Sequence, residues 1–279
     1  MSVILALGAA ILYGLSDFLG GVVSRRTSVW PVGLLACVGG FAGALVLAVV
    51  GPGGATTTHL AWGLLAGIGS GSGTAFLYRG LAGGRMGVVA PVSAVGAVLL
   101  PLFVGLLAAE RPGTLGWIGI VVALPGIWLV SREEDTAIDG SPAGPSGLLD
   151  GILAGVGFGL LFAALGQVPD DVGFWPIAAT QAMSVLSLVV TAVALGGDPR
   201  PRHRAEFLGL VPGVLATAAV LLFLLATGRG LLSVAAVLTS LYPAFTVLLA
   251  MVVLHERVHR AQAVGLALCA LTVVCVSAG

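Results

Sequence analysis

Ten apolar runs, each close to the length of a membrane-spanning helix, limit what this 279-residue chain can fold into. A spanning helix needs about 20 mainly apolar residues, within a range of roughly 17–25. The sequence is 58% hydrophobic and only 9% charged, whereas a soluble domain carries roughly 25% charged residues. We therefore predict an all-α integral membrane protein with ten transmembrane helices, at residues 3–23, 30–50, 60–78, 87–108, 115–131, 148–166, 174–196, 207–226, 233–254 and 262–278.

The chain repeats one pattern. An apolar run ends in Glu110-Arg111 and a second in Glu256-Arg257, and a glycine follows each glutamate at the same spacing, Gly119 and Gly265. Such a repeat predicts two halves, 1–131 and 148–279, joined by a polar linker at 132–147. Because five helices are an odd number, the second half enters the membrane from the opposite side. We expect two inverted five-helix repeats, which are characteristic of alternating-access transporters.

The arginines are divided unevenly between the two ends of the predicted helices. Connections on one side carry ten of them, and those on the other side carry only Arg111 and Arg229. By the positive-inside rule the arginine-rich side faces the cytoplasm, which would leave both termini outside. We expect a multi-pass protein of the cytoplasmic membrane. The formal net charge of zero gives no reason to expect a nucleic-acid partner.

Asp17 lies well inside the first predicted helix, close to Tyr13 and Ser16. A charged group within a span costs roughly 2.5–3.5 kcal/mol on insertion scales, so it should face a cavity or a partner. In a functional interpretation Asp17 binds a cationic substrate or carries a coupling proton. In a structural interpretation it pairs with an arginine near a helix end, such as Arg79, or is hydrated near the interface. The sequence leaves both open.

The matching stretch of the second half, Gly159-Leu160-Leu161-Phe162, has no acidic residue. The two halves therefore differ chemically, and together they could bind an asymmetric organic molecule. Phe158 and Phe162 would offer an apolar wall where Asp17 offers charge. Tyr78 is a further amphipathic side chain that could line the same space.

The fourth predicted helix contains Pro91 and Pro101, and the ninth contains Pro243. A proline inside a helix frees a carbonyl and kinks the axis. Kinks at matching places in two halves point to a substrate site, although bending for packing alone is the alternative. The polar residues beside these prolines are further substrate-site candidates: Ser93, Thr239, Ser240 and Tyr242. Gln181 in the seventh helix is another candidate, although a hydrogen bond to a neighbouring helix is an equal alternative for its amide.

One sequence match favours a different class of protein, an intramembrane zinc metalloprotease. His255-Glu256-Arg257-Val258-His259 fits H-E-x-x-H, which on a helix supplies two zinc ligands and a general base. Leu149-Asp150-Gly151 resembles the motif that gives site-2-type proteases their third ligand. Against this, Glu110-Arg111 repeats the motif without histidines, and the match straddles a helix end. We expect no catalytic residues, no metal and no cofactor.

With these motifs in hand, the chain resembles the drug/metabolite transporter superfamily, and within it the ten-helix, two-repeat EamA-type transporters. Pro243, Glu256-Arg257 and Gly265 resemble the family's Ser-Pro…Gly-Glu-Arg…Gly pattern, with Tyr242 in place of the serine and His255 in place of the glycine. The first copy has Ala97 for the proline and Ala109 for the glycine, and the stretch at 13–18 is similar to the family's Trp-Gly-Ser-Asn-Phe motif.

This resemblance implies a carrier that moves a small organic metabolite or drug by alternating access, and we expect an exporter. Bacterial members are thought to export amino acids or related metabolites, often by proton antiport. Family members usually have cytoplasmic termini, opposite to the arginine count. We expect the substrate to lie among helices 1, 3, 4, 6, 8 and 9, with Asp17 as the proton-coupling residue. The partners would be the small-molecule substrate, the lipid bilayer and protons, and the chain would be a monomer or a homodimer.

Overall fold

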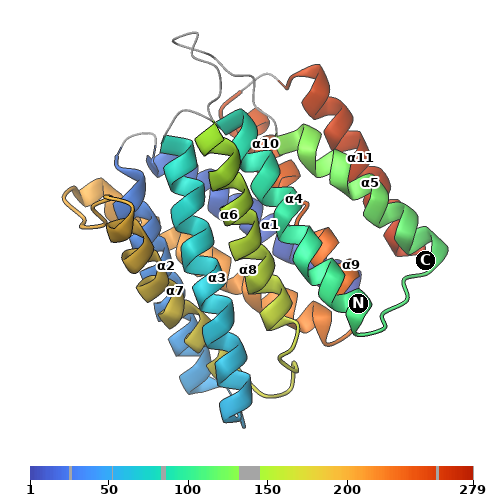
Figure 1. Cartoon of the computed structure of the whole chain (residues 1–279), viewed down its shortest axis with the longest axis horizontal. Coiled ribbons are helices and arrows are strands. Elements are labelled where there is room, and N and C mark those ends of the chain that lie inside the picture. The colour runs from blue at the N-terminus through green and yellow to red at the C-terminus, as the bar shows by residue number, and fades with distance from the viewer. Residues whose placement is uncertain (25–26, 52, 83–85, 132–144, 256–257, 279) are drawn as a thin grey trace.

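The computed structural model describes residues 1–24, 27–51, 53–82, 86–131, 145–255 and 258–278. Within these ranges the secondary structure is entirely helical, and ten segments are long and apolar enough to cross a membrane. The prediction of ten spanning helices is thus confirmed (Figure 1). The helices are α1 (Ser2–Ser24), α2 (Val29–Val50), α3 (Thr57–Ala82), α4 (Met86–Leu107), α5 (Thr114–Ser131), α6 (Pro145–Leu165), α7 (Trp175–Ala194), η1 (Arg204–Gly209), α8 (Leu210–Thr227), α9 (Leu232–Thr239), α10 (Tyr242–Val253) and α11 (Arg260–Ala278).

The ninth span is broken in its middle. It comprises the short helix α9 and the helix α10, which are separated by Ser240 and Leu241. Pro243 is in the first turn of α10, where its missing N–H is tolerated and where it cannot continue the hydrogen bonding of α9. In α4, by contrast, Pro91 and Pro101 lie inside one continuous helix. The prolines of the two halves therefore have different effects on their helices.

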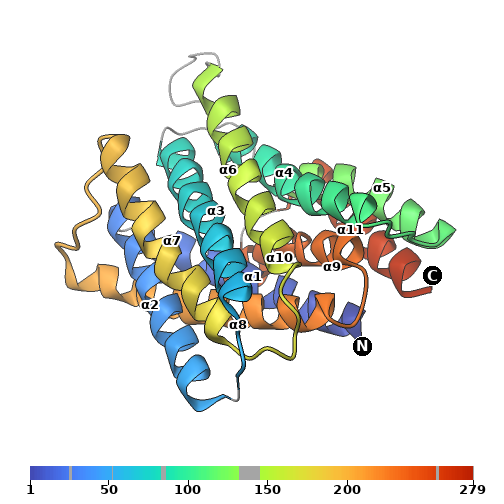
Figure 2. The ribbon, with the colours of Figure 1, turned by 60° about the horizontal axis from the view of Figure 1, so that its bottom comes forward.

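Eight of the spans form a closed ring in which the two halves of the sequence alternate. Each helix packs against the next in the order α1, α8, α2, α7, α3, α6, α4 and the α9–α10 pair, which returns to α1. Exchanging each helix for its counterpart in the other half reproduces the same ring. The fifth span of each half, α5 and α11, pair with each other at one edge of the bundle (Figure 2).

Glycines permit the closest of these contacts. Gly63, Gly67 and Gly71 lie along one face of α3 at helical spacing, and a Cβ at each would overlap a backbone carbonyl of α7, at Pro176, Thr180 and Ser184 respectively. The small-residue spacing of α3 thus brings two backbones into direct contact, as it commonly does between helices in lipid. This contact fixes the distance between α3 and α7 in the ring.

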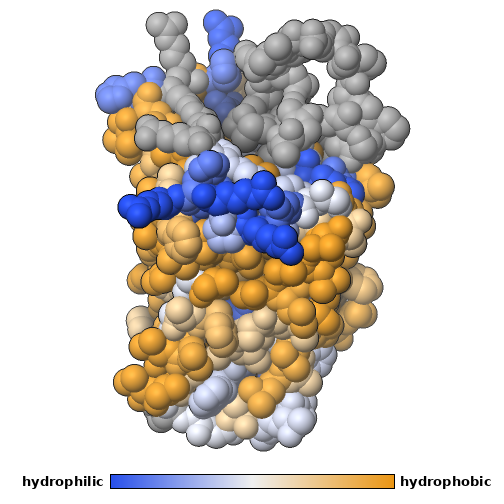
Figure 3. Space-filling model, turned by 90° about the vertical axis from the view of Figure 1, so that its left-hand side faces the viewer, coloured by the Kyte–Doolittle hydropathy of each residue, from blue (hydrophilic) through white to orange (hydrophobic). Residues whose placement is uncertain are grey.

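Charge is concentrated at one end of the molecule. Arg200, Arg202 and Arg204 are exposed in the connection between α7 and α8, and Figure 3 shows a hydrophilic band at this end above a broad apolar belt. The backbone N–H of Arg200 donates to Asp198 and holds the pKa of that carboxyl below its ordinary value. Both termini lie away from this end (Figure 1). We call it the arginine-rich end.

The first Glu-Arg copy has a structural role at the opposite end. Ala109 adopts φ 60°, and the N–H groups of Ala109 and Glu110 donate to Leu106 and Gly105, which is a Schellman ending of α4. This turn directs the Glu110 carboxylate to the start of α9. There it accepts from the N–H groups of Leu232 and Ser233 at 2.6 and 3.0 Å. Glu110 of the first half therefore caps the broken helix of the second half.

Candidate functional site

A cavity of about 130 Å³ lies inside the ring, between the two halves. A single water molecule requires roughly 10–15 Å³ on this measure, so a small organic molecule fits. The lining residues come from the first three helices of each half and from α10. The cavity therefore involves α2, which was not expected, and α7, from which only Gln181 was a candidate, while α4 contributes none of the lining residues among the described part of the chain.

Seven of the predicted substrate-site residues line this cavity, as Gln181 also does, whereas Ser93, Thr239 and Ser240 do not. The lining ones are Tyr13, Ser16, Asp17, Tyr78, Phe158, Phe162 and Tyr242. Ser93 is buried in α4 and donates to the carbonyl of Ala90 at 2.9 Å. Ser240 is completely buried at the break between α9 and α10, and its hydroxyl has no hydrogen-bond partner among the described residues. Placement in the cavity leaves the roles of the seven as predictions.

Asp17 lines the cavity and is an exposed residue. It makes no hydrogen bond and no ion pair within the described part of the chain. The predicted structural partner, Arg79, instead donates to Asp150 of α6, with its Nε 2.9 Å from Oδ1. The proposed pairing of Asp17 with Arg79 is therefore wrong. Asp17 is the only charged residue among the described residues that line the cavity.

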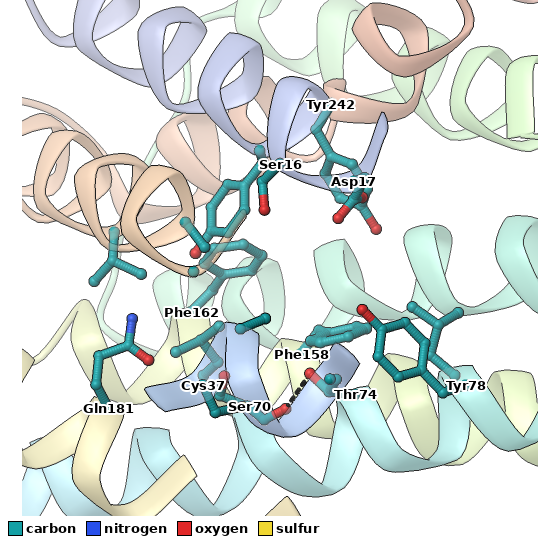
Figure 4. Close-up of a pocket in the computed structure, with 18 residues that line it drawn as sticks. Ser16, Asp17, Cys37, Ser70, Thr74, Tyr78, Phe158, Phe162, Gln181 and Tyr242 are labelled. Carbon is teal, nitrogen blue, oxygen red and sulfur yellow. Dashed lines mark hydrogen bonds between the residues drawn. The ribbon is translucent and has the colours of Figure 1, made fainter. Parts of the chain in front are cut away.

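Aromatic rings surround the carboxylate. Tyr13 lies edge-on to Phe162 with 6.0 Å between the ring centroids, and 6.1 Å from the ring of Tyr242. Asp17 lines the same cavity as the side chains of Tyr13, Tyr78 and Tyr242. In Figure 4, Asp17 comes from α1 on one side of the cavity, and Tyr78 from α3 projects toward it from the other. A carboxylate among aromatic faces is suited to a cationic group.

The polar residues near Asp17 differ in whether they are already bonded. The Ser16 hydroxyl donates to the carbonyl of Pro212 at 2.8 Å and so ties α1 to α8. Thr74 donates to the backbone of Ser70. The Tyr13 hydroxyl is buried without a hydrogen-bond partner among the described residues. Tyr13 is therefore a donor that a ligand or water could satisfy, whereas Ser16 is occupied by the protein itself.

Sequence reasoning missed the contribution of α2 and of two polar residues of α3 to the lining. Cys37, Ser70 and Thr74 line the cavity, but isolated small polar residues in apolar runs give no signal that separates lining from packing. Gln181 makes the interhelical hydrogen bond that was one of its two predicted roles, and contact with a ligand stays a prediction. It lines the cavity, and its Nε2 donates to Thr217 at 2.8 Å, linking α7 to α8.

The geometry around the zinc-protease match does not support a metal site. His255 has φ 56° and follows the end of α10, while His259 precedes the start of α11, so the two histidines are not on one helix. Glu256 and Arg257 lie outside the described residues. Asp150, the suspected third ligand, is engaged by Arg79. Among the described residues no group of three His, Cys, Asp or Glu side chains could hold a metal ion.

Comparison with known proteins identifies the family. The sequence model of the EamA-like transporter family matches residues 1–132 and 145–278, which is nearly the whole chain and leaves out only the region of the linker. No curated protein matches the chain. A solved structure recorded as "Crystal structure of protein" is 18% identical, with a TM-score of 0.73 over 99% of this chain and 98% of that one. At that identity the likeness extends to the fold alone.

Proposed function

The chain belongs to the EamA-like transporter family, a family of membrane transporters of small molecules, and on that premise we propose that it carries a small organic metabolite or drug across the cytoplasmic membrane by alternating access through the central cavity. The observation that carries the proposal is the position of the cavity. It lies between two halves that alternate around a ring. Movement of one half against the other would therefore change access to it.

The part of the cavity around Asp17 and Tyr78 lies toward the arginine-rich end. Asp17 and Tyr78 lie in the last two turns of α1 and α3, both of which run toward that end. Toward the other end the helices pack closely around Ala6, Ala9 and Phe223, each of which is fully buried. We infer a state open to the arginine-rich side, which the positive-inside rule assigns to the cytoplasm. Export then begins with capture of substrate from the cytoplasm.

Inverted repeats supply the second state. If the halves are related by a two-fold axis in the membrane plane, as five helices per half requires, each half can adopt the conformation of the other. The exchange would close the cavity at the arginine-rich end and open it at the opposite end. The ring order, which is unchanged when the halves are exchanged, supports this relation.

Asp17 is our candidate for proton coupling. A lone carboxylate in a water-accessible cavity can bind either a proton or a substrate, and competition between the two links transport to a pH gradient. No other lining residue among the described ones can serve, because the remaining titratable groups are Cys37 and three tyrosines, which release their protons only at alkaline pH. We expect Asp17→Asn to abolish stimulation of transport by a pH gradient.

The test is side-specific labelling of an engineered thiol. Ser70→Cys is made in a background in which Cys37, Cys269 and Cys275 are replaced, and the protein is reconstituted in vesicles. A membrane-impermeant maleimide should label it from the arginine-rich side, and a transported substrate should shift labelling toward the other side. A cysteine at the outward-facing position Ile11, which is 48% exposed, should stay unlabelled in lipid. Labelling of Ser70→Cys from neither side under any condition would refute access through the cavity.

A further inference from the structure

The cavity walls contributed by the two halves match each other position by position. Tyr13 and Phe158, and likewise Asp17 and Phe162, are 145 residues apart, and all four line the cavity. Ser70 of α3 and Ala216 of α8 line it as well, 146 residues apart, the same separation as between Glu110 and Glu256. These pairs are thus equivalent positions of the two repeats.

Within each pair the polar member belongs to the first half. Tyr13, Asp17 and Ser70 have hydrogen-bonding groups, and their counterparts Phe158, Phe162 and Ala216 have none. Two further lining pairs with the same separations, Ser16 with Leu161 and Thr74 with Val220, follow the same rule. The exception is the pair of Ala36 and Gln181, in which the polar member belongs to the second half. The Gln181 amide already donates a hydrogen bond to Thr217. Among the described lining residues, Gln181 and Tyr242 are the polar side chains of the second half, which otherwise provides an apolar wall, whereas the first half provides a polar one.

In the ring, the two helices α1 and α3 of the polar wall lie across the cavity from each other, and so do the two helices α6 and α8 of the apolar wall. α1 does not neighbour α3, and α6 does not neighbour α8, because each is four places away in the ring order. Asp17 of α1 therefore faces the polar residues of α3 across the cavity, as Figure 4 shows for Tyr78. Phe158 and Phe162 of α6 line the cavity together with Gly213, Ala216 and Val220 of α8, and the Phe162 ring packs on Phe223 of α8 with 4.8 Å between the ring centroids. A ligand in this space meets polar groups along one direction and apolar surface along the other.

From this arrangement, and resting on the proposed transport function, we infer that the substrate is a small organic cation with an apolar body. Its ammonium group binds between the Asp17 carboxylate and the Tyr78 hydroxyl, and its apolar part lies between Phe158 and the α8 wall. An anionic substrate would meet Asp17 without any basic group among the described lining residues to balance its charge. A substrate without an apolar part would leave the apolar wall without a contact.

The charge preference should depend on pH through Asp17 alone. The other titratable groups that face the cavity are Tyr13 on α1, Cys37 on α2, Tyr78 on α3 and Tyr242 on α10, and these are neutral in weakly acidic and neutral solution. Lining residues from α6, α7 and α8 do not titrate: Phe158, Leu161, Phe162, Gln181, Gly213, Ala216 and Val220. Binding of the cation should weaken as pH falls and Asp17 is protonated.

The experiment compares four probes of related size by isothermal calorimetry on the purified full-length protein. They are 3-phenylpropylamine, 3-phenylpropanol, 3-phenylpropionate and propylamine. We expect the aromatic amine to bind about tenfold or more tightly than the alcohol, because a charge-assisted hydrogen bond is lost in the latter. The carboxylate should not bind detectably, and propylamine should bind weakly because it leaves the apolar wall uncovered.

Variants assign each preference to a wall. Asp17→Asn should remove the advantage of the amine over the alcohol. Phe158→Ala should weaken 3-phenylpropylamine by about 2- to 10-fold, as loss of an aromatic contact predicts, and leave propylamine unchanged. Asp198→Asn, an exposed carboxylate outside the cavity, is the matched control and should change neither. Thermal unfolding of each variant verifies that it is folded.

Two outcomes would overturn the inference while leaving transport intact. One is tighter binding of 3-phenylpropionate than of the amine. The other is a preference for the amine that persists in folded Asp17→Asn. If none of the four probes binds but the Ser70→Cys labelling still switches sides with some other compound, the substrate class is wrong and the transport function stands. If the labelling also fails, the proposed function itself fails.

Discussion

The backbone at Ala109 and His255 predicts that two glycine substitutions stabilise the protein. These residues have φ 60° and 56°, the left-handed region that glycine adopts without a steric penalty. They precede the two repeated glutamates, and the family pattern described above has glycine at both positions. Each is an exposed side chain at a helix end, so little packing is lost when it is removed. The strained conformation should therefore dominate the effect of both substitutions.

The magnitude follows from two opposing terms. A left-handed conformation costs a non-glycine residue roughly 1–2 kcal/mol, and glycine loses about 0.5–1 kcal/mol more backbone entropy on folding than alanine does. Ala109→Gly should therefore stabilise the fold by about 0–1.5 kcal/mol, and His255→Gly by a similar amount. The two sites belong to separate helix ends, so the double variant should show roughly the sum.

The measurement is thermal unfolding of the purified protein in one detergent, with Ala108→Gly as the matched control. Ala108 is also exposed and adjacent to Ala109, but its φ is not positive. Glycine there should therefore lower the unfolding temperature or leave it unchanged. If Ala109→Gly is no more stable than Ala108→Gly, the left-handed ending of α4 is not what determines the residue preference at this position, and the reasoning is refuted.

Three further stability predictions concern contacts between the halves. Glu110→Ala should cost about 2 kcal/mol, because it strands the N–H groups at the start of α9; an unchanged unfolding temperature would contradict the cap. Gly67→Ala, where a Cβ would overlap the α7 backbone, should cost about 1–3 kcal/mol, whereas Gly21→Ala in open space should be neutral or stabilising. A double-mutant cycle between Arg79 and Asp150 should give a coupling energy of about 1–3 kcal/mol, since the Asp150 side chain is 7% exposed; additive effects would argue against the ion pair.

Hydropathy predicted the positions of the spans well but not the interruption of the ninth. The first span was expected at 3–23 and is Ser2–Ser24, and the fifth was expected at 115–131 and is Thr114–Ser131. Hydropathy measures how favourably a stretch partitions into lipid. That value is the same whether the stretch forms one continuous helix or two helices with a break between them. The prolines were seen, but three prolines gave one break. Whether a proline ends a helix depends on what the neighbouring helices offer its freed carbonyl, and a single sequence does not contain that information.

A lining residue could be predicted from the sequence where placing its side chain in lipid would cost much free energy. It could not be predicted where that cost is small. Asp17 and the tyrosines stood out because their polar groups need a partner or water. Ser70 and Cys37 did not, since small residues are common at ordinary helix contacts. Ser93 was predicted from its neighbour Pro91 and does not line the cavity, because α4 lies outside the lining. The alternation of the halves around the ring is a property of packing between distant segments.

That alternation implies that neither half is an independent folding unit. Around the ring every neighbour of a first-half helix belongs to the second half, and the fifth spans also pair across the halves. The fragment 1–131 expressed alone would therefore expose the faces of α1, α2 and α3 that normally pack on α8, α7 and α6, and we expect it to be degraded or aggregated. Expressed together with 145–279, it should give a complex whose thermal unfolding approaches that of the intact chain, because the cut removes only the connection at 132–144.

A cut between α2 and α3 tests the same argument from the opposite direction. Both fragments would again insert as helices, and the helices on either side of the cut contact each other little compared with their contacts across the halves. Reassembly should therefore succeed at this site as well. If the fragment 1–131 instead proves stable and monomeric by itself, the contacts within a half must be sufficient for folding. Alternating access would then have to proceed by rocking of two self-contained bundles, not by rearrangement of an interleaved ring.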